Sequence, residues 1–166
     1  MLILKTASLR AAMYCSAKKD VRYYLNGILI EATAIGRDVY TVGTNGHVLF
    51  AGKQDATWYG EPKAGPWSVI IPADILKTAL SGYKGLVIHL DFLPDVGEDK
   101  QCTLGNVNFT PVDARFPDWR RATPTGKMSG DAGQYNPAYL ATCQDALMVW
   151  NDRKGGLDCS VMQYNG

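Results

Sequence analysis

The sequence contains few of the residues from which catalytic and metal sites are built. It has only two histidines and four cysteines, and no two of the cysteines form a C-x-x-C pair; they are His47, His89, Cys15, Cys102, Cys143 and Cys159. The spacing typical of zinc ligands is therefore absent. The sequence also contains no G-x-S-x-G, H-E-x-x-H, P-loop or G-x-G-x-x-G pattern. We predict that the protein is not an enzyme and has no catalytic residue, metal or cofactor.

The sequence also lacks an excess of either charge and any long apolar run. Lysine and arginine number 17 against 16 for aspartate and glutamate, a net charge of +1 that gives no bulk attraction to nucleic acid or anionic lipid. No stretch approaches the roughly 18 apolar residues of a membrane span, and Lys5 ends the apolar opening at once. Scattered cysteines without a secretory segment are typical of a reducing compartment. We expect a cytoplasmic protein that does not enter a membrane.

What the sequence does contain is a recurring order of strand, short helix and strand. Aliphatic residues at 1–6 predict a strand, and Ser8 is a suitable N-cap for the helix after it. The pattern begins again at Trp67, where Pro72 suits the first position of a second helix. A third helix is predicted from Pro137, before a last strand at 159–164. The other predicted strands are 23–32, 39–44, 48–51, 67–71, 86–92 and 101–112.

Two interpretations of this recurrence remain open. Two full units and a partial third favour an internal duplication. Any α+β protein can show similar stretches, because proline at a helix start is common. The pair Asn45-Gly46 is the strongest local signal, since both residues of a tight hairpin turn need positive φ. Cys15 and Cys143 fall on apolar faces of predicted helices, which indicates packed thiols and not nucleophiles.

Three segments, in this order along the chain, carry a specific resemblance. They are 22–27 (R-Y-Y-L-N-G), 44–49 (T-N-G-H-V-L) and 116–121 (F-P-D-W-R-R). They resemble R-Y-Y-L-N-G, T-D-G-H-R-L and F-P-D-Y-R-R in the middle domain of the bacterial DNA polymerase III beta subunit, the sliding-clamp family. Two charges of that pattern are missing, because Asn45 replaces its aspartate and Val48 its arginine.

The resemblance implies the α+β DNA-clamp fold, with duplicated strand–helix–strand units and helices on one face of antiparallel sheets. It implies a clamp-like domain over 1–124, whose two units are related by a pseudo-two-fold axis. Residues 125–166 would be a linker and a partial following clamp unit with one helix and one strand. A shortened relative of this kind would suit a phage or mobile element.

The resemblance also implies two sets of binding residues. Clamps enclose duplex DNA without reading its bases, so weak and non-specific contacts from a few cations suffice. The cations expected on the inner helices are Arg10, Lys18, Lys19 and Lys77. The family binds short peptides of DNA polymerase and other partners in a pocket, which here would comprise Thr44, Gly46, His47, Leu49 and Pro124. The alternative is that these residues only build a hairpin and a linker.

Two functions follow from the resemblance. The first is a processivity-type clamp that self-associates around DNA and tethers replication proteins. The second is a clamp-like module that binds partner peptides or clamp subunits without encircling DNA, as a decoy or regulator. Oligomeric state discriminates between them, because a ring built from such short chains requires a homo-oligomer. Trp119 is expected to be buried as an anchor of the linker, with Arg120 and Arg121 hydrogen-bonded beside it.

Overall fold

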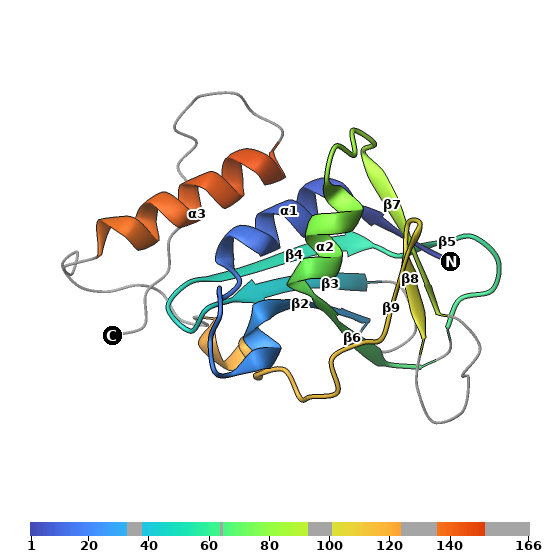
Figure 1. Ribbon diagram of the computed structural model, residues 1–166, viewed down its shortest axis with the longest axis horizontal. Helices are drawn as coiled ribbons and strands as arrows, with labels where there is room; N and C mark the ends of the chain where they lie inside the picture. The colour runs from blue at the N-terminus through green and yellow to red at the C-terminus, as the bar shows by residue number, and fades with distance from the viewer. Residues whose placement is uncertain (33–37, 64, 93–100, 124–135, 152–166) are drawn as a thin grey trace.

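The computed structural model describes residues 1–32, 38–63, 65–92, 101–123 and 136–151 (Figure 1). The first part of the chain holds β1 (Leu2–Lys5), α1 (Thr6–Cys15), the 3-10 turn η1 (Tyr23–Asn26), β2 (Gly27–Ala32), β3 (Asp38–Thr44), β4 (Leu49–Asp55) and β5 (Thr57–Trp58). The second part holds β6 (Trp67–Pro72), α2 (Ala73–Leu80), β7 (Val87–Phe92), β8 (Cys102–Leu104), β9 (Val107–Phe109), the 3-10 turn η3 (Trp119–Ala122) and α3 (Pro137–Trp150).

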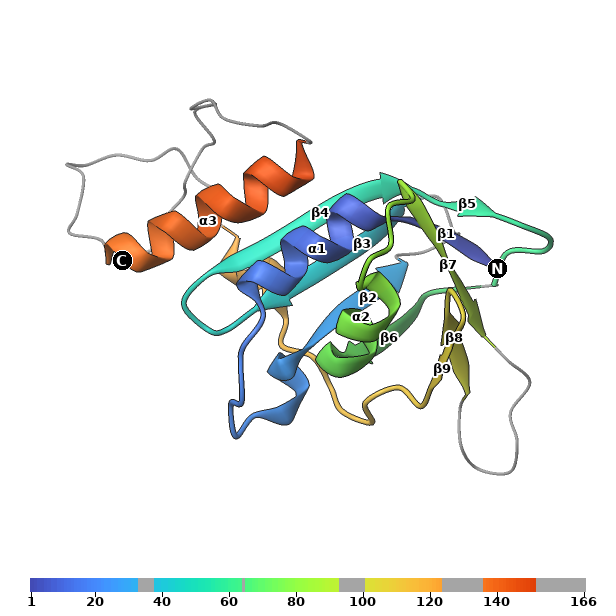
Figure 2. The same ribbon diagram turned by 45° about the horizontal axis from the view of Figure 1, so that its top comes forward.

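The strands form two antiparallel sheets. One has the order β5-β1-β7-β8-β9 and the other the order β4-β3-β2-β6. In Figures 1 and 2, α1 and α2 lie on the same side of the four-stranded sheet, α1 over β3 and β4 and α2 near β6. The α+β class with helices on one face of antiparallel sheets, predicted from the sequence, is therefore confirmed.

Strand β2 is buried from both sides, which explains its nearly continuous run of apolar residues. Ile28 and Ile30 belong to the apolar cluster that faces the helices. Leu29, which points to the opposite face, belongs to a second cluster with Phe116 and Trp119. We call these the inner cluster and the outer cluster. The chain after β9 therefore returns across the outer face of the four-stranded sheet and covers it.

Helix α1 begins earlier than predicted and without the predicted cap. It starts at Thr6, and its N-cap position is Lys5, which makes no side-chain capping bond. Ser8 lies fully buried within the helix instead, and its hydroxyl oxygen is 2.9 Å from the place where a Cβ on Gly52 would stand. Packing against β4 therefore places Ser8 inside the helix, although serine favours the N-cap position.

Three other local predictions were wrong in detail. Residues 23–26 form a 3-10 turn and not the start of a strand. Pro72 ends β6 at the N-cap position of α2 and does not occupy its first helical turn. Residues 101–112 contain two short strands that pair with each other, β8 and β9, joined at Gly105 with φ +59°.

Some predictions fall on residues outside those that the structure describes. They include the last strand at 159–164 and Pro124. The domain limits 1–124 and 125–166 stay predictions. Within the described part of the chain, α1, α2 and α3 are all too short or too polar to cross a membrane.

Gly43 marks the closest approach of β3 to α1 and gives a test of this packing. A Cβ at Gly43 would stand 2.1 Å from the Ala12 carbonyl oxygen, so the helix would have to move. We expect Gly43→Ala to lower the free energy of unfolding by about 3 kcal/mol, measured by urea denaturation. The control is Gly82→Ala, which has φ +66° but open space around it, and whose backbone strain should cost only about 1–2 kcal/mol. Equal losses in the two variants would contradict the close packing of α1 on β3.

Candidate functional site

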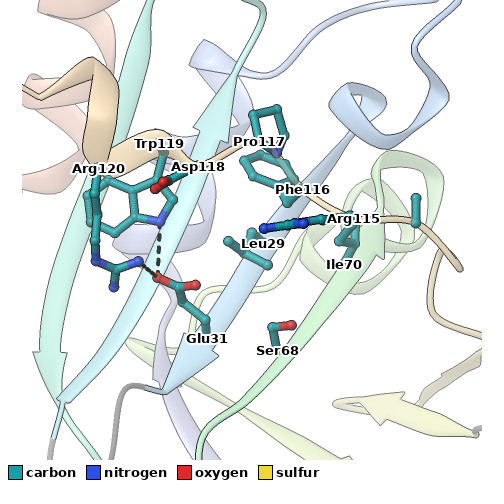
Figure 3. Close-up of a pocket in the computed structure, with 11 residues that line it drawn as sticks. Leu29, Glu31, Ser68, Ile70, Arg115, Phe116, Pro117, Asp118, Trp119 and Arg120 are labelled. Atoms are coloured by element: carbon teal, nitrogen blue, oxygen red, sulfur yellow. Dashed lines mark hydrogen bonds and ion pairs between the residues drawn. The ribbon is translucent and has the colours of Figure 1, made fainter.

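The connector after β9, residues 110–123, is anchored by Trp119 and Arg120, as the sequence predicted. The hydrogen bond predicted for the Arg121 side chain does not occur among the described residues, where Arg121 is exposed. Only 9% of Trp119 is exposed, and its indole Nε1 donates a hydrogen bond of 3.0 Å to Glu31 Oε1 (Figure 3). Arg120 pairs with the same carboxylate oxygen at 2.6 Å. The Arg120 guanidinium also lies 4.3 Å from the Trp119 ring centroid and 5.2 Å from that of Tyr40. These contacts bind the connector to β2 and β3.

The loop between β3 and β4, residues 45–48, is held by two side chains that bond the main chain. The Thr44 hydroxyl donates to the Val48 carbonyl at 2.7 Å and accepts from Gly46 N–H at 3.1 Å. Asn45 Oδ1 accepts from the N–H groups of His47 and Val48 at 2.9 and 3.0 Å. Gly46 has φ +91°, whereas Asn45 does not have positive φ. The hairpin is thus present, but with a longer turn than the tight Asn-Gly type predicted.

Arg22 lies against this loop and was missed as a site residue. Its guanidinium nitrogens would stand 3.3 and 3.4 Å from a Cβ on Gly46. Asp20 holds it through Nε at 3.0 Å and Nη2 at 2.9 Å, and also accepts the Arg22 N–H at 2.8 Å. These hydrogen bonds lower the pKa of the Asp20 carboxyl from 3.8 to about 2. Its place at the head of R-Y-Y-L-N-G was the available signal, but only the fold brings residues 22 and 46 together.

Four of the five predicted peptide-pocket residues lie in the described part of the chain, around this loop, without forming one cluster of side chains. His47 stacks on Tyr139 of α3, with ring centroids 4.9 Å apart and planes 11° from parallel. Leu49 instead packs against the outer cluster, while Val48 between them is buried in the inner cluster. Thr44 and Gly46 form the loop itself, and Pro124 is outside the described residues.

The four predicted DNA-binding cations occupy two kinds of environment. Arg10 Nη2 donates to the carbonyls of Leu80 and Tyr83 at 3.0 and 2.8 Å, so its guanidinium ties α1 to the end of α2. Lys18 and Lys19 follow α1 and Lys77 lies on α2, and all three are exposed. Among the described residues, no salt bridge involves any of these three lysines.

Helix α3 packs on α1 and brings Cys143 near Cys15. Burial and the neighbouring Cys143 raise the pKa of the Cys15 thiol from 9.0 to about 12. A thiol held so firmly in its neutral form is a poor nucleophile and a poor metal ligand. No group of three or more metal-ligating side chains occurs in the described ranges.

Replacing the anchor should test its contribution to stability. Trp119→Ala removes a large buried side chain and leaves Glu31 without its indole donor, so we expect a loss of about 3–5 kcal/mol in the free energy of unfolding. The control Arg121→Ala changes an exposed neighbour and should cost less than about 0.5 kcal/mol. A Trp119→Ala loss under about 1 kcal/mol, measured by urea denaturation, would show that the anchor is not part of the core.

The pKa of Asp20 gives a pH prediction for the loop. Because this pKa is lower in the folded protein than the ordinary 3.8, the Asp20–Arg22 pair contributes its full stabilisation above about pH 4. That contribution is lost as the pH falls from 4 toward about 2, where the carboxylate becomes protonated. An NMR titration of the Asp20 carboxyl carbon should report this low midpoint, and Arg22→Gln should raise the midpoint only part of the way toward 3.8, because the main-chain N–H of residue 22 still donates to Asp20. A midpoint near 4 in the unaltered chain would argue against the pair.

Comparison with known proteins identifies relatives of this chain. No family model matches the sequence. The beta sliding clamp of Pseudomonas aeruginosa is 32% identical over 140 residues, which are 78% of this chain and 35% of that protein. The beta sliding clamp of Salmonella typhimurium is 34% identical over 122 residues, 70% of this chain and 30% of that protein.

Solved structures agree with these matches. The DNA polymerase III subunit beta from Pseudomonas aeruginosa superposes with a TM-score of 0.52 at 30% identity, covering 76% of this chain and 35% of that one. The DNA polymerase III beta chain from Streptococcus pneumoniae gives a TM-score of 0.55 at 18% identity over 75% of this chain and 33% of that one, which bears on the fold alone. The chain spans about a third of the length of these relatives. Over the part that aligns, it belongs to the beta sliding clamp family and has the clamp fold.

Proposed function

We propose that this chain acts in DNA replication as a clamp-type binding protein of the cytoplasm and not as an enzyme. The observation that carries the proposal is the match of about three quarters of the chain, in sequence and in fold, to beta sliding clamps. The three segments that define the resemblance correspond to structural features, namely the η1–β2 start, the β3–β4 loop and the Trp119 anchor. The chemistry required of a clamp is contact and not bond breaking.

The proposed DNA contact is made by the exposed lysines near α1 and α2. Lys18, Lys19 and Lys77 have no acidic partner among the described residues, so their ammonium groups are available to phosphates. Arg10 donates to two carbonyl groups, and its contribution to DNA binding is correspondingly smaller. Contacts to phosphates alone give binding that does not depend on sequence and falls steeply with salt. Because these contacts are few, the binding is weak.

The salt dependence of duplex binding tests this proposal. Replacing Lys18, Lys19 and Lys77 with alanine should reduce the log–log salt slope by about 0.9 for each phosphate that is no longer neutralised, measured by fluorescence anisotropy with two unrelated duplexes. The matched control is Lys53→Ala, because Lys53 on β4 is also exposed but its ammonium group already pairs with Asp38 on β3. Equal slopes for the triple variant and the unaltered chain, or a preference for one duplex, would contradict the proposal.

The proposed protein partners are DNA polymerase or other proteins with clamp-binding peptides. In this proposal the peptide contacts Thr44, Gly46, His47 and Leu49 at the β3–β4 loop, together with Pro124 of the predicted linker. Arg22 is added to this set because its guanidinium lies over Gly46. Tyr139 of α3 already stacks on His47, so a bound peptide must either extend this aromatic contact or displace it.

A second candidate is a clamp-like module that binds partner peptides or clamp subunits without encircling DNA. The engagement of Arg10 by carbonyls favours it, as does the packing of α3, whose only charged side chain is Asp145, against α1. Light scattering during size exclusion separates the two functions, with duplex DNA present and absent. A homo-oligomer that retains DNA supports the clamp, whereas a monomer at micromolar concentration supports the module.

A further inference from the structure

The outer face of the four-stranded sheet carries a pocket that neither proposed binding site uses. Its volume is about 260 Å³, and it lies between β2, β6 and the connector (Figure 3). We call it the outer pocket, and the lining residues that matter here are Leu29, Glu31, Ser68, Ile70, Arg115 and Phe116. The β3–β4 loop adjoins the opposite edge strand in the order β4-β3-β2-β6, so the two sites are separate.

The pocket exists because the connector is fastened to the sheet at two points. The Val112 N–H donates to the Ile70 carbonyl at 3.0 Å, and the Trp119 indole donates to Glu31 at 3.0 Å. Between these points Phe116 is buried against the sheet, whereas Arg115 and Pro117 are exposed. The floor below this span is apolar, formed by Leu29 and Ile70.

The edge of β6 beside the pocket is open to another strand. Ile70 faces the connector with its main-chain carbonyl, on the side away from β2. Main-chain groups two residues apart in a strand point to the same edge, so the N–H and C=O of Ser68 point there too. Neither group has a hydrogen-bond partner in the described part of the chain. An unpaired edge of this kind is a template for strand addition.

The charges at the pocket are also incomplete. Arg120 pairs with Glu31, whose Oε1 also receives the Trp119 indole N–H. Arg115 takes part in no salt bridge among the described residues, and Figure 3 shows its side chain extended along the pocket beside Leu29. A ligand that carries a carboxylate would therefore complete this site, since a guanidinium prefers that partner.

We propose that the outer pocket binds an extended acidic peptide segment of a partner protein. The segment adds to the edge of β6 at Ser68, sets an apolar side chain over Leu29 and Ile70, and places a carboxylate at Arg115. Small-molecule sites typically have about 300–1,000 Å³, and this pocket is smaller, so it suits one or two side chains of a longer ligand. Strand addition supplies affinity through the main chain, and the pocket supplies specificity.

The probe is the capped peptide acetyl-Thr-Leu-Thr-Asp-Thr-amide, whose leucine and aspartate fall on one face of a strand. Titration into the full chain should shift the Ser68 amide and the Trp119 indole resonances in a saturable manner. The probe with asparagine in place of aspartate should bind about tenfold more weakly, equivalent to about 1.4 kcal/mol.

Two pairs of variants locate the binding. Arg115→Gln should weaken binding of the acidic probe about tenfold. The control is Arg121→Gln, which should leave the affinity unchanged, because Arg121 is exposed on the same connector but does not line the pocket. Ser68→Pro removes the edge N–H and should abolish binding, whereas Ser68→Ala should retain it. Proline is tolerated on an edge strand when its missing N–H would point away from the neighbouring strand, so Ser68→Pro should fold. A Trp119 indole signal at its usual position, without probe, will confirm that each variant is folded.

Any of four results with the probe would overturn the inference. They are the absence of any shift at millimolar probe, equal weakening of binding by Arg115→Gln and Arg121→Gln, unchanged binding in folded Ser68→Pro, and shifts confined to His47 and Leu49. The same resonances moving with protein concentration in the absence of the probe would assign the edge to a second copy of the chain and also refute a peptide partner. None of these results depends on DNA binding, so the proposed function is tested separately.

Discussion

Glu31 stands on the outward side of a strand that is otherwise apolar, and one of its oxygens receives both the Trp119 indole and the Arg120 guanidinium. Its side chain is only 17% exposed, so these two donors take the place of water at Oε1. The connector must therefore cross the outer face at this point, and Phe116 and Trp119 are carried onto Leu29. Without that polar contact the outer face of the sheet would present an uncovered apolar surface.

The same arrangement explains why the sheet can carry two different edges. Strand β2 is enclosed by the helices on one side and by the connector on the other, which fixes its register with β3 and β6. The connector then covers only part of β6, through the bond from Val112 to Ile70. The opposite edge strand, β4, begins at the loop held by Thr44 and Asn45. The contacts that enclose β2 therefore stabilise the fold and also leave edge strands β4 and β6 partly uncovered.

Most of the fold could be predicted from the sequence, because its signals are local. The pattern that begins again at Trp67 predicted a helix after Pro72, where α2 lies, and the apolar residues of 39–44 predicted β3. The start of α1 could not be predicted, since the burial of Ser8 against Gly52 depends on a strand about 40 residues away. The carbonyl partners of Arg10 lie 70 and 73 residues from it in sequence, and the contact of Arg22 with Gly46 likewise requires the folded chain. Long-range contacts, more than local structure, therefore decide which cations and which loop residues are free to contact a ligand.

The two departures from the family pattern at the β3–β4 loop have a physical explanation in the structure. Asn45 accepts two main-chain N–H bonds through Oδ1, a task that a carboxylate oxygen also performs, so the turn is kept while its negative charge is removed. Val48 is 6% exposed and belongs to the inner cluster, where a charged side chain would be costly to bury. The remaining charges beside the loop, Asp20 and Arg22, neutralise each other. A peptide bound at this loop, as proposed, would be recognised by shape and by apolar contact with residues such as His47 and Leu49. Arg115, which is in no salt bridge among the described residues, lies beside β6 at the other edge of the sheet.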